Sequence, residues 1–313
     1  EVHNESLSSS DLSSNPYLHA RVEASASYFH GTPDWFYPPF PEDSTLLPLI
    51  VINTNGQPIP TEPRITATMK LVDNPPGIYN FPDDPGNGYD GQISLEIRGE
   101  SSAYFSLKKS YSLETQTELG ENNNVSLLGL PQENDWVLYG PYLDKSLIRN
   151  VLSYRLFEEM GNYAPRTRFV EVILNNDYQG VYILTEKIKR DKNRVDIAKL
   201  LPGDISGDEL TGGYLLRIDK LSEMTSEEYW DSPIIPPFAE YKPLTYQYFD
   251  PKPEELNEEQ RSYIRMHMQE FESALIHRDF KDPDRGYRAY LDIPSFVDMM
   301  ILNEFTQNKL NQK

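Results

Sequence analysis

Hydrophobic and polar residues alternate along much of the first two thirds of the chain, with the two-residue period of half-buried β-strands. The clearest case is residues 93–98, where isoleucine and leucine alternate with Ser, Glu and Arg. Asn175-Asn176-Asp177 separates two apolar runs and predicts a β-hairpin. The pattern predicts further strands over 49–52, 64–72, 108–114, 169–174, 181–186 and 213–218.

A helical period of three to four residues appears in three places. The first predicted helix has Asp144 as its N-cap, Leu147 to Met160 on its apolar face and Gly161 as its stop. A Pro- and aromatic-rich loop is predicted over 229–253, followed by a helix over 254–280 and another from Pro294. We therefore expect an α+β protein with a β-rich N-terminal lobe that carries one inserted helix, a helical C-terminal lobe, and a cleft between the lobes.

The first 46 residues have a different composition. Residues 1–30 are rich in Ser, Asn and Glu, and residues 31–48 place five prolines among Trp35, Phe36, Tyr37 and Phe40. We interpret 1–46 as an N-terminal extension with a packed aromatic strap; a glycan-binding aromatic surface is the alternative. The main domain would then run from 47 to 313, with the β-rich lobe over about 47–220 and the helical lobe over about 250–313.

Composition limits the partners. The 313-residue chain has a formal net charge of −20, which repels nucleic acid and anionic membrane surfaces. It contains no cysteine, which excludes disulfides, thiolate metal sites and a cysteine nucleophile. No apolar run approaches the roughly 18 residues of a membrane span. The chain shows no signal segment, and we expect the mature form of an exported, extracellular or cell-surface protein.

Cationic residues at the ends of strands are the first candidate ligand-binding groups. Arg98 ends one strand and Lys108-Lys109 begins the next. Adjacent strand residues point to opposite faces, so only one of the two lysines is expected to face a cleft. With Arg98 it could hold a di- or triphosphate; a surface charge pair with Glu96 or Glu114 is the alternative.

Three more residues are candidates because of their positions. Arg149 lies near the start of the predicted helix, where free N–H groups favour anions; it could equally pair with a carboxylate. Glu186 ends an apolar strand before a basic connector that could join the lobes near a nucleobase, or could be a solvated turn. Asp219 ends another strand and is a candidate for metal binding, although such residues often form turns.

Several phrases, in this order, resemble the spore-coat protein H (CotH) kinase family. The resemblance covers the chain from about residue 47 to the C-terminus. The phrases are Ile97-Arg98-Gly99-Glu100-Ser101-Ser102, Lys108-Lys109-Ser110-Tyr111, Asp135-Trp136-Val137-Leu138, Asp144-Lys145-Ser146-Leu147-Ile148-Arg149-Asn150, Gly180-Val181-Tyr182-Ile183-Leu184-Thr185-Glu186-Lys187, Gly212-Gly213-Tyr214-Leu215-Leu216-Arg217-Ile218-Asp219, Asn303-Glu304 and Asn308.

The resemblance implies an atypical protein-kinase-like fold that binds ATP with Mg²⁺ or Mn²⁺ and phosphorylates Ser or Thr of secreted or surface proteins. It implies that Lys108 or Lys109 meets the phosphates and that Glu186 lies at the hinge near the adenine. The helix over 144–160 would take the place of the regulatory helix of kinases.

One position departs from the family pattern. Members usually continue Asn-x-Asp after the Asn-Glu helix and later carry a Trp-Asp-x-Asp/Asn phrase, whereas Leu310 follows Asn308 at the position of the Asp. Phosphoryl transfer depends on metal-binding and positioning carboxylates, so the catalytic residues stay unassigned. We expect an incompletely represented kinase. A non-catalytic module on the same fold that binds protein or glycan is the alternative, and a carbohydrate-active enzyme a weaker third.

Overall fold

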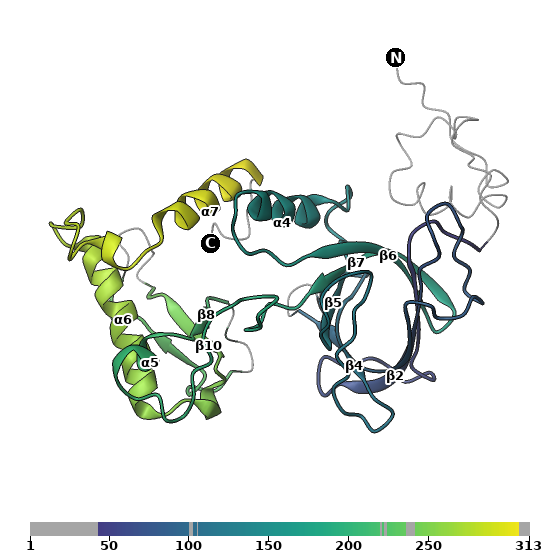
Figure 1. Ribbon diagram of the computed structural model, residues 1–313, viewed down its shortest axis with the longest axis horizontal. Coiled ribbons are helices and arrows are strands. Elements are labelled where there is room, and N and C mark those ends of the chain that lie inside the picture. Colours follow the sequence, from purple (N-terminus) through teal and green to yellow (C-terminus); the bar gives the residue numbers. More distant parts are fainter. Residues whose placement is uncertain are drawn as a thin grey trace, which may run out of the picture.

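The computed structural model of the chain describes residues 43–99, 103–104, 106–219, 221, 224–235 and 242–306. Most of the expected N-terminal extension, together with Asn308 and Leu310, lies outside the described residues. The α+β class is confirmed: the described chain begins with a β-barrel and ends in a smaller sheet with helices (Figure 1).

Seven strands form the barrel, and each predicted β-segment of the first two thirds corresponds to one of them. The strand order is β1-β2-β3-β4-β5-β7-β6. All neighbours are antiparallel except β1 and β6, which pair in parallel and close the barrel. The strands are β1 Leu49–Asn53, β2 Ile65–Val72, β3 Tyr89–Arg98, β4 Ser110–Gln116, β5 Asp135–Tyr139, β6 Thr167–Leu174 and β7 Asp177–Glu186.

Alternate residues of these strands fill the barrel interior. Leu113, Trp136, Leu138 and Leu184 belong to one buried cluster, and Trp136 is fully buried. The indole N–H of Trp136 donates to the Glu133 carbonyl oxygen at 3.1 Å, as a buried indole requires. The alternation in the sequence therefore reflects one face packed inside the barrel and one face outside it.

A polar tie secures the closing edge of the barrel. The Thr54 N–H donates to Asn175 Oδ1 at 2.8 Å, and the Asn175 N–H donates to the Ile52 carbonyl at 2.9 Å. Asn175 and Asn176 both have positive φ, 52° and 65°, the conformation that hairpin turns demand and asparagine tolerates. The hairpin prediction is confirmed, and its turn also holds the end of β1.

The helix inserted between β5 and β6 starts later than the sequence predicts. Helix α4 spans Arg149–Glu159, because Leu147 has a φ of +64° and breaks the helical path. Asp144 still serves the helix start, since its carboxylate accepts the Arg149 N–H at 2.8 Å. Gly161, with a φ of +90°, lies just beyond the helix end as predicted.

The prediction of a loop over 229–253 is wrong. This segment contains two strands of a three-stranded sheet with the order β8-β10-β9. The Trp230 ring packs on Tyr246 and Tyr248 at centroid distances of 5.3 and 4.7 Å. Cross-strand aromatic packing outweighs the Pro-rich composition here. The strands are β8 Leu215–Arg217, β9 Tyr229–Asp231 and β10 Thr245–Asp250.

The remaining helices belong to this C-terminal region, by which we mean the described residues from 197 onward. The two predicted long helices are confirmed as α6 and α7, and no described helix is long and apolar enough to cross a bilayer. Asn257 begins α6 with a capping box to Gln260. The elements are α5 Gly207–Thr211, η3 Pro253–Glu255, α6 Glu258–Ile276, η4 Tyr287–Ala289 and α7 Ile293–Thr306.

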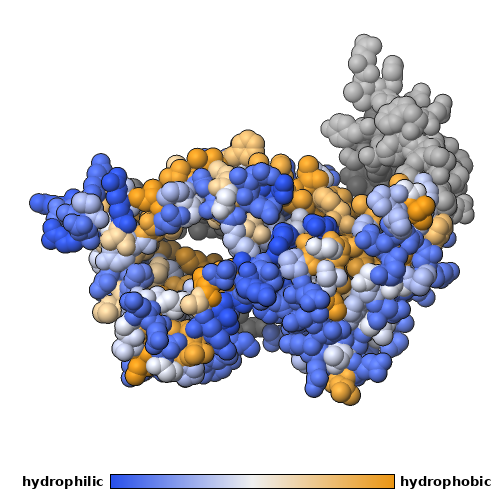
Figure 2. Space-filling model, viewed as in Figure 1, coloured by the Kyte–Doolittle hydropathy of each residue, from blue (hydrophilic) through white to orange (hydrophobic). Residues whose placement is uncertain are grey.

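The barrel and the C-terminal region touch through α4 and α7. These helices contact each other near their ends (Figure 1), and Asn162 Nδ2 donates to Asp298 Oδ2 at 2.7 Å. The chain also crosses between the two parts along the connector, residues 187–196, which follows β7. Figure 2 shows an opening in the surface between the α4–α7 pair and the rest of the molecule.

Candidate functional site

Lys108 lies over the core at one end of the barrel. Its ammonium donates to the Val181 carbonyl at 2.6 Å and lies 4.5 Å from the centre of the Tyr182 ring. Burial lowers the pKa of Lys108 to about 8, and the nearby Glu171 carboxylate only partly offsets this effect. Gly140 leaves room for the lysine stem, because a Cβ there would lie 3.0 Å from Lys108 Cγ.

Lys109 points to a different part of the molecule. Its ammonium donates to the carbonyl oxygens of Ala103 and Ser106 at 2.6 and 2.7 Å. It therefore holds the loop between β3 and β4. The prediction that the two adjacent lysines diverge is confirmed.

The alternative partners proposed for these cations are wrong. Glu96 and Glu114 both pair with Arg64, whose Nε lies 3.2 Å from Glu96 Oε1 and whose Nη1 contacts Glu114 Oε1. The three residues come from or next to adjacent strands of the barrel. They form a structural charge network that leaves the lysines to other partners.

Two predicted phosphate ligands lie near α4. Arg98 is exposed at the end of β3, and its charge lowers the pKa of Tyr154 on α4, although burial of that phenol raises the pKa more. Arg149 starts the helix with a side chain that is 79% exposed, 3.6 Å from the Asp144 carboxylate. The fold thus brings the end of β3 to the same helix that carries Arg149.

Glu186 is held inside the structure by an arginine. Its side chain has no exposed area and accepts from Arg166 Nε and Nη2, both at 2.9 Å. The Arg166 N–H also donates to this carboxylate at 2.9 Å, and its guanidinium reaches the Asn193 carbonyl. Glu186 therefore ends β7 where predicted, directly before the connector, but its carboxylate already has a bidentate partner.

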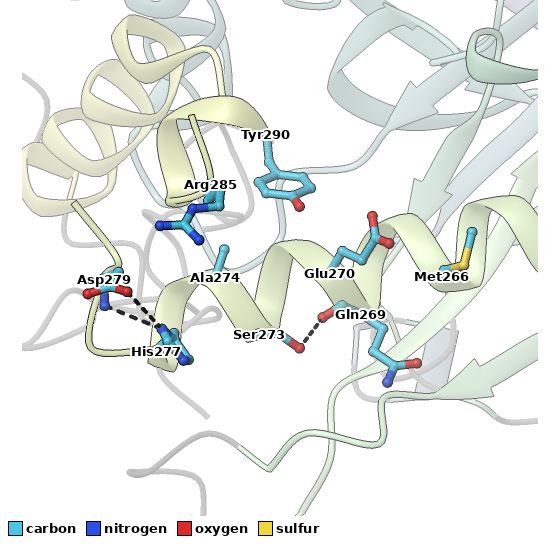
Figure 3. A pocket seen from close by; sticks show the side chains of 9 residues that line it. All are labelled: Met266, Gln269, Glu270, Ser273, Ala274, His277, Asp279, Arg285 and Tyr290. Atoms are coloured by element: carbon cyan, nitrogen blue, oxygen red, sulfur yellow. Dashed lines mark hydrogen bonds and ion pairs between the residues drawn. The ribbon is translucent and has the colours of Figure 1, made fainter. Parts of the chain in front are cut away.

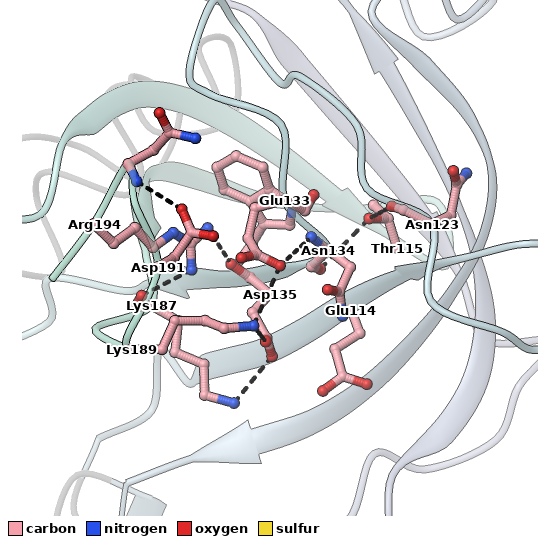
Figure 4. Close-up of polar contacts among 12 residues, drawn as sticks. Glu114, Thr115, Asn123, Glu133, Asn134, Asp135, Lys187, Lys189, Asp191 and Arg194 are labelled. Carbon is pink, nitrogen blue, oxygen red and sulfur yellow. Dashed lines mark hydrogen bonds and ion pairs between the residues drawn. The ribbon is translucent and has the colours of Figure 1, made fainter. Parts of the chain in front are cut away.

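The connector is bound to the barrel by a cluster that sequence reasoning missed (Figure 4). Lys187 Nζ lies 3.0 Å and Lys189 Nζ 2.7 Å from the Asp135 carboxylate, and Lys189 also reaches Glu133 at 3.3 Å. Burial raises the pKa of Asp135, but the two lysines hold it well below its usual range. The interpretation of this segment as a solvated turn is wrong. Glu133 and Asp135 beside an apolar strand were the available signal.

Arg194 completes the attachment of the connector. It is 5% exposed, lies 5.4 Å from the Trp136 ring, and donates to the carbonyls of Lys187 and Asp135 at 2.8 and 2.9 Å. A buried guanidinium satisfied by carbonyl oxygens and an aromatic face stabilises one conformation. The basic connector is consequently a rigid extension of the barrel.

Asp219 follows β8 in the C-terminal region, away from the lysines. It is exposed, and its carbonyl oxygen accepts from Gln247 Nε2 at 2.7 Å. Among the residues that the structure describes, no group of three or more His, Cys, Asp or Glu side chains could hold a metal ion. Asp219 as a metal ligand therefore stays a prediction.

A separate groove of about 700 Å³ runs along α6 (Figure 3). Met266, Glu270 and His277 of α6 line it together with Asp279, Arg285 and Tyr290 from the following segment. None of the predicted ATP- or metal-binding residues lines this groove. The groove is therefore not the predicted nucleotide site.

Taken together, the described site offers cations at several positions but not one assembled catalytic centre. Arg98 and Arg149 present exposed positive charge beside α4, a suitable arrangement for an anionic ligand. Lys108, Lys109 and Glu186 have intramolecular partners. Their contacts fix the barrel end, the β3–β4 loop and the start of the connector.

A comparison with protein families agrees with the order of the motifs. A search of curated proteins found no match. The family model described as CotH kinase protein matches residues 95–309, more than half of the chain. The match begins within β3 and includes the two lysines, α4, the connector and α7. The chain belongs to the CotH kinase protein family.

Proposed function

We propose that this protein is an exported atypical protein kinase that binds ATP with Mg²⁺ or Mn²⁺ and transfers phosphate to Ser or Thr of secreted or surface proteins. The observation that carries the proposal is the family match over residues 95–309. That range contains all five predicted nucleotide ligands, Arg98, Lys108, Lys109, Arg149 and Glu186.

The exposed arginines beside α4 are the best candidates for the phosphates. Arg149 has the freedom to turn toward a ligand, since its side chain is 79% exposed and its contact with Asp144 is long at 3.6 Å. Arg98 lies near the same helix. In kinases the metal neutralises the charge that develops during phosphoryl transfer. A nucleotide-bound Mg²⁺ takes one or two carboxylates in addition to the phosphates, and Asp219 is the predicted one.

Nucleotide binding is tested by thermal unfolding with ATP, with and without Mg²⁺ or Mn²⁺. Ligand at ~100 times its dissociation constant adds about 2.7 kcal/mol to the free energy of unfolding. Each kcal/mol raises Tm by roughly 2–4 °C for a domain of roughly 150–250 residues. We expect Arg98→Ala and Arg149→Ala to reduce the metal-dependent shift. Arg155→Ala is the matched control, because Arg155 is also exposed on α4 but pairs with Glu158 and Glu159.

Transfer of labelled γ-phosphate to secreted proteins then tests catalysis. Absence of a thermal shift for a longer chain with metal present would overturn the proposal.

A non-catalytic role is the second candidate. It is favoured by the intramolecular partners of Lys108 and Glu186, which leave neither group open to a nucleotide in this conformation. Capture of a protein or glycan that is insensitive to ATP, and that survives Arg98→Ala with Arg149→Ala, would support this role.

A further inference from the structure

One ion pair joins the connector to the small sheet of the C-terminal region. Arg190 Nε lies 3.3 Å from Asp250 Oδ1, and both side chains are partly buried, with 27% and 24% exposure. Asp250 is the last residue of β10. Partial burial limits screening by salt, so this pair is better placed to hold two elements together than an exposed pair.

Arg190 itself is fixed to the barrel through its neighbours. Lys187 and Lys189 bind Asp135 on β5, and Arg194 is buried against Trp136. Arg190 pairs with Val195 in an isolated parallel bridge. Its guanidinium therefore extends from a part of the connector that is fixed to the barrel. The ion pair with Asp250 consequently restrains the position of the small sheet relative to the barrel.

A second polar contact links the same two parts at another place. Asn162, which follows α4, donates to Asp298 of α7 at 2.7 Å. In Figure 1 the α4–α7 contact lies above the connector that runs from β7 toward β8, and Figure 2 shows the surface open between them. The two ties thus lie on different sides of the opening. Together they restrict rotation of one part against the other.

We propose that Arg190 is a positioning residue: its ion pair with Asp250, together with the Asn162–Asp298 hydrogen bond, sets the separation of the barrel from the C-terminal region. This inference rests on the proposed function only where it concerns the nucleotide. A ligand held between the two parts binds only the fraction of molecules that have the correct separation. The apparent dissociation constant of the ligand is its intrinsic value divided by this fraction, so breaking either contact lowers the fraction and raises the apparent constant.

The separation is measured directly with spin labels. The chain contains no cysteine, so introduced cysteines are the only sites that the spin label can modify. Glu118→Cys after β4 and Glu259→Cys on α6, both at exposed positions, place one label on each part. We expect Arg190→Ala to broaden or shift the distance distribution, and Arg190→Asp with Asp250→Arg to restore it. Arg155→Ala, which breaks an exposed pair within α4, should leave the distribution unchanged.

An unchanged distribution in Arg190→Ala at low salt, with Asn162→Ala also present, would overturn the proposal. Far-ultraviolet circular dichroism of each variant separates a local change in separation from unfolding.

Nucleotide affinity gives the second readout. Exposed and partly exposed ion pairs have small energies, so we expect Arg190→Ala to raise the dissociation constant of ATP by about two- to fivefold, with recovery in the charge-swapped variant. If the spin-label distances respond but ATP does not bind to any variant, the tie stands and the proposed nucleotide function fails. If ATP binds equally to all variants and the distances do not change, the positioning role fails.

Discussion

The barrel excludes water from its core, whereas the C-terminal region leaves much of its apolar surface exposed. Trp136, Leu138 and Leu184 have no exposed area, but Met300 and Phe305 on α7 are 66% and 72% exposed. A closed sheet satisfies its backbone hydrogen bonds around the whole circle and buries one face of every strand. In the described part of the chain, α4 is the element with which α7 makes substantial contact. A single neighbour covers only one side of a helix and leaves the other sides exposed.

This difference in burial gives the two parts different structural roles. The barrel, extended by its bound connector, is a rigid base that fixes Arg98, Lys109 and the start of α4. The C-terminal region has a small buried cluster around Leu200, Tyr248 and Ile264 and depends more on its ties to the barrel. Regions with few buried apolar contacts open at lower free energy than cores do.

The largest expected loss of stability comes from a substitution in the barrel core. Trp136→Ala removes a fully buried indole and should lower the free energy of unfolding by about 3–5 kcal/mol. Met300→Ala on α7 should change it by only about 0.5 kcal/mol. Urea unfolding of the two variants measures both. Equal losses would contradict the comparison, because they would require α7 to be buried as deeply as the barrel core.

A slightly smaller loss is expected where the barrel meets the connector. Arg166→Ala leaves the Glu186 carboxylate buried without its bidentate partner, and breaking a buried pair in this way costs about 3 kcal/mol. Arg166→Ala with Glu186→Gln removes the stranded charge and should recover part of the loss.

Chemical unfolding of both variants tests whether Glu186 is structural. If Arg166→Ala were as stable as the parent protein, the carboxylate would be free to act elsewhere, as the nucleotide-binding prediction requires.

The smallest effect concerns the buried cation at the barrel end. Lys108 has a folded-state pKa of about 8 against an ordinary value of 10.5. Between these pH values the unfolded chain holds more protons, so the contribution of Lys108 to stability rises as pH increases. The stability difference between the parent protein and Lys108→Met should change over this window. Lys145→Met, at an exposed lysine, is the matched control. A flat difference would show that Lys108 is solvated.

Local patterns predicted most of the elements because their physical causes are local. Strand patterns identified six of the seven barrel strands but not β5, Asp135–Tyr139, and Asn175-Asn176 identified the hairpin because asparagine tolerates positive φ. The N-cap of α4 was predicted at Asp144, four residues before the observed Ile148, because a single residue, Leu147, adopts a left-handed conformation that its side chain does not favour. The strands β9 and β10 were missed because their stability comes from Trp230 packing on tyrosines rather than from a long alternating pattern.

The candidate site was predictable in its residues but not in their partners. The motif order pointed to Arg98, Lys108, Lys109, Arg149 and Glu186. The two lysines diverge as expected, although both precede β4 and do not belong to the strand. The arginine that holds Glu186 lies 20 residues away in sequence, and the acid that holds Lys187 lies 52 residues away. No local rule connects such positions, so the attachment of the connector to the barrel was not foreseen.

The sequence by itself determined the α+β class, the family and the residue types at the site, because these depend on periodicity, composition and motif order. Only the tertiary structure decided that the sheet closes into a barrel, since β1 meets β6 across more than 100 residues. It alone also decided which charges pair, through the register of distant strands. Whether a cation contacts a carbonyl, a carboxylate or water depends on burial, and burial is a property of the folded chain.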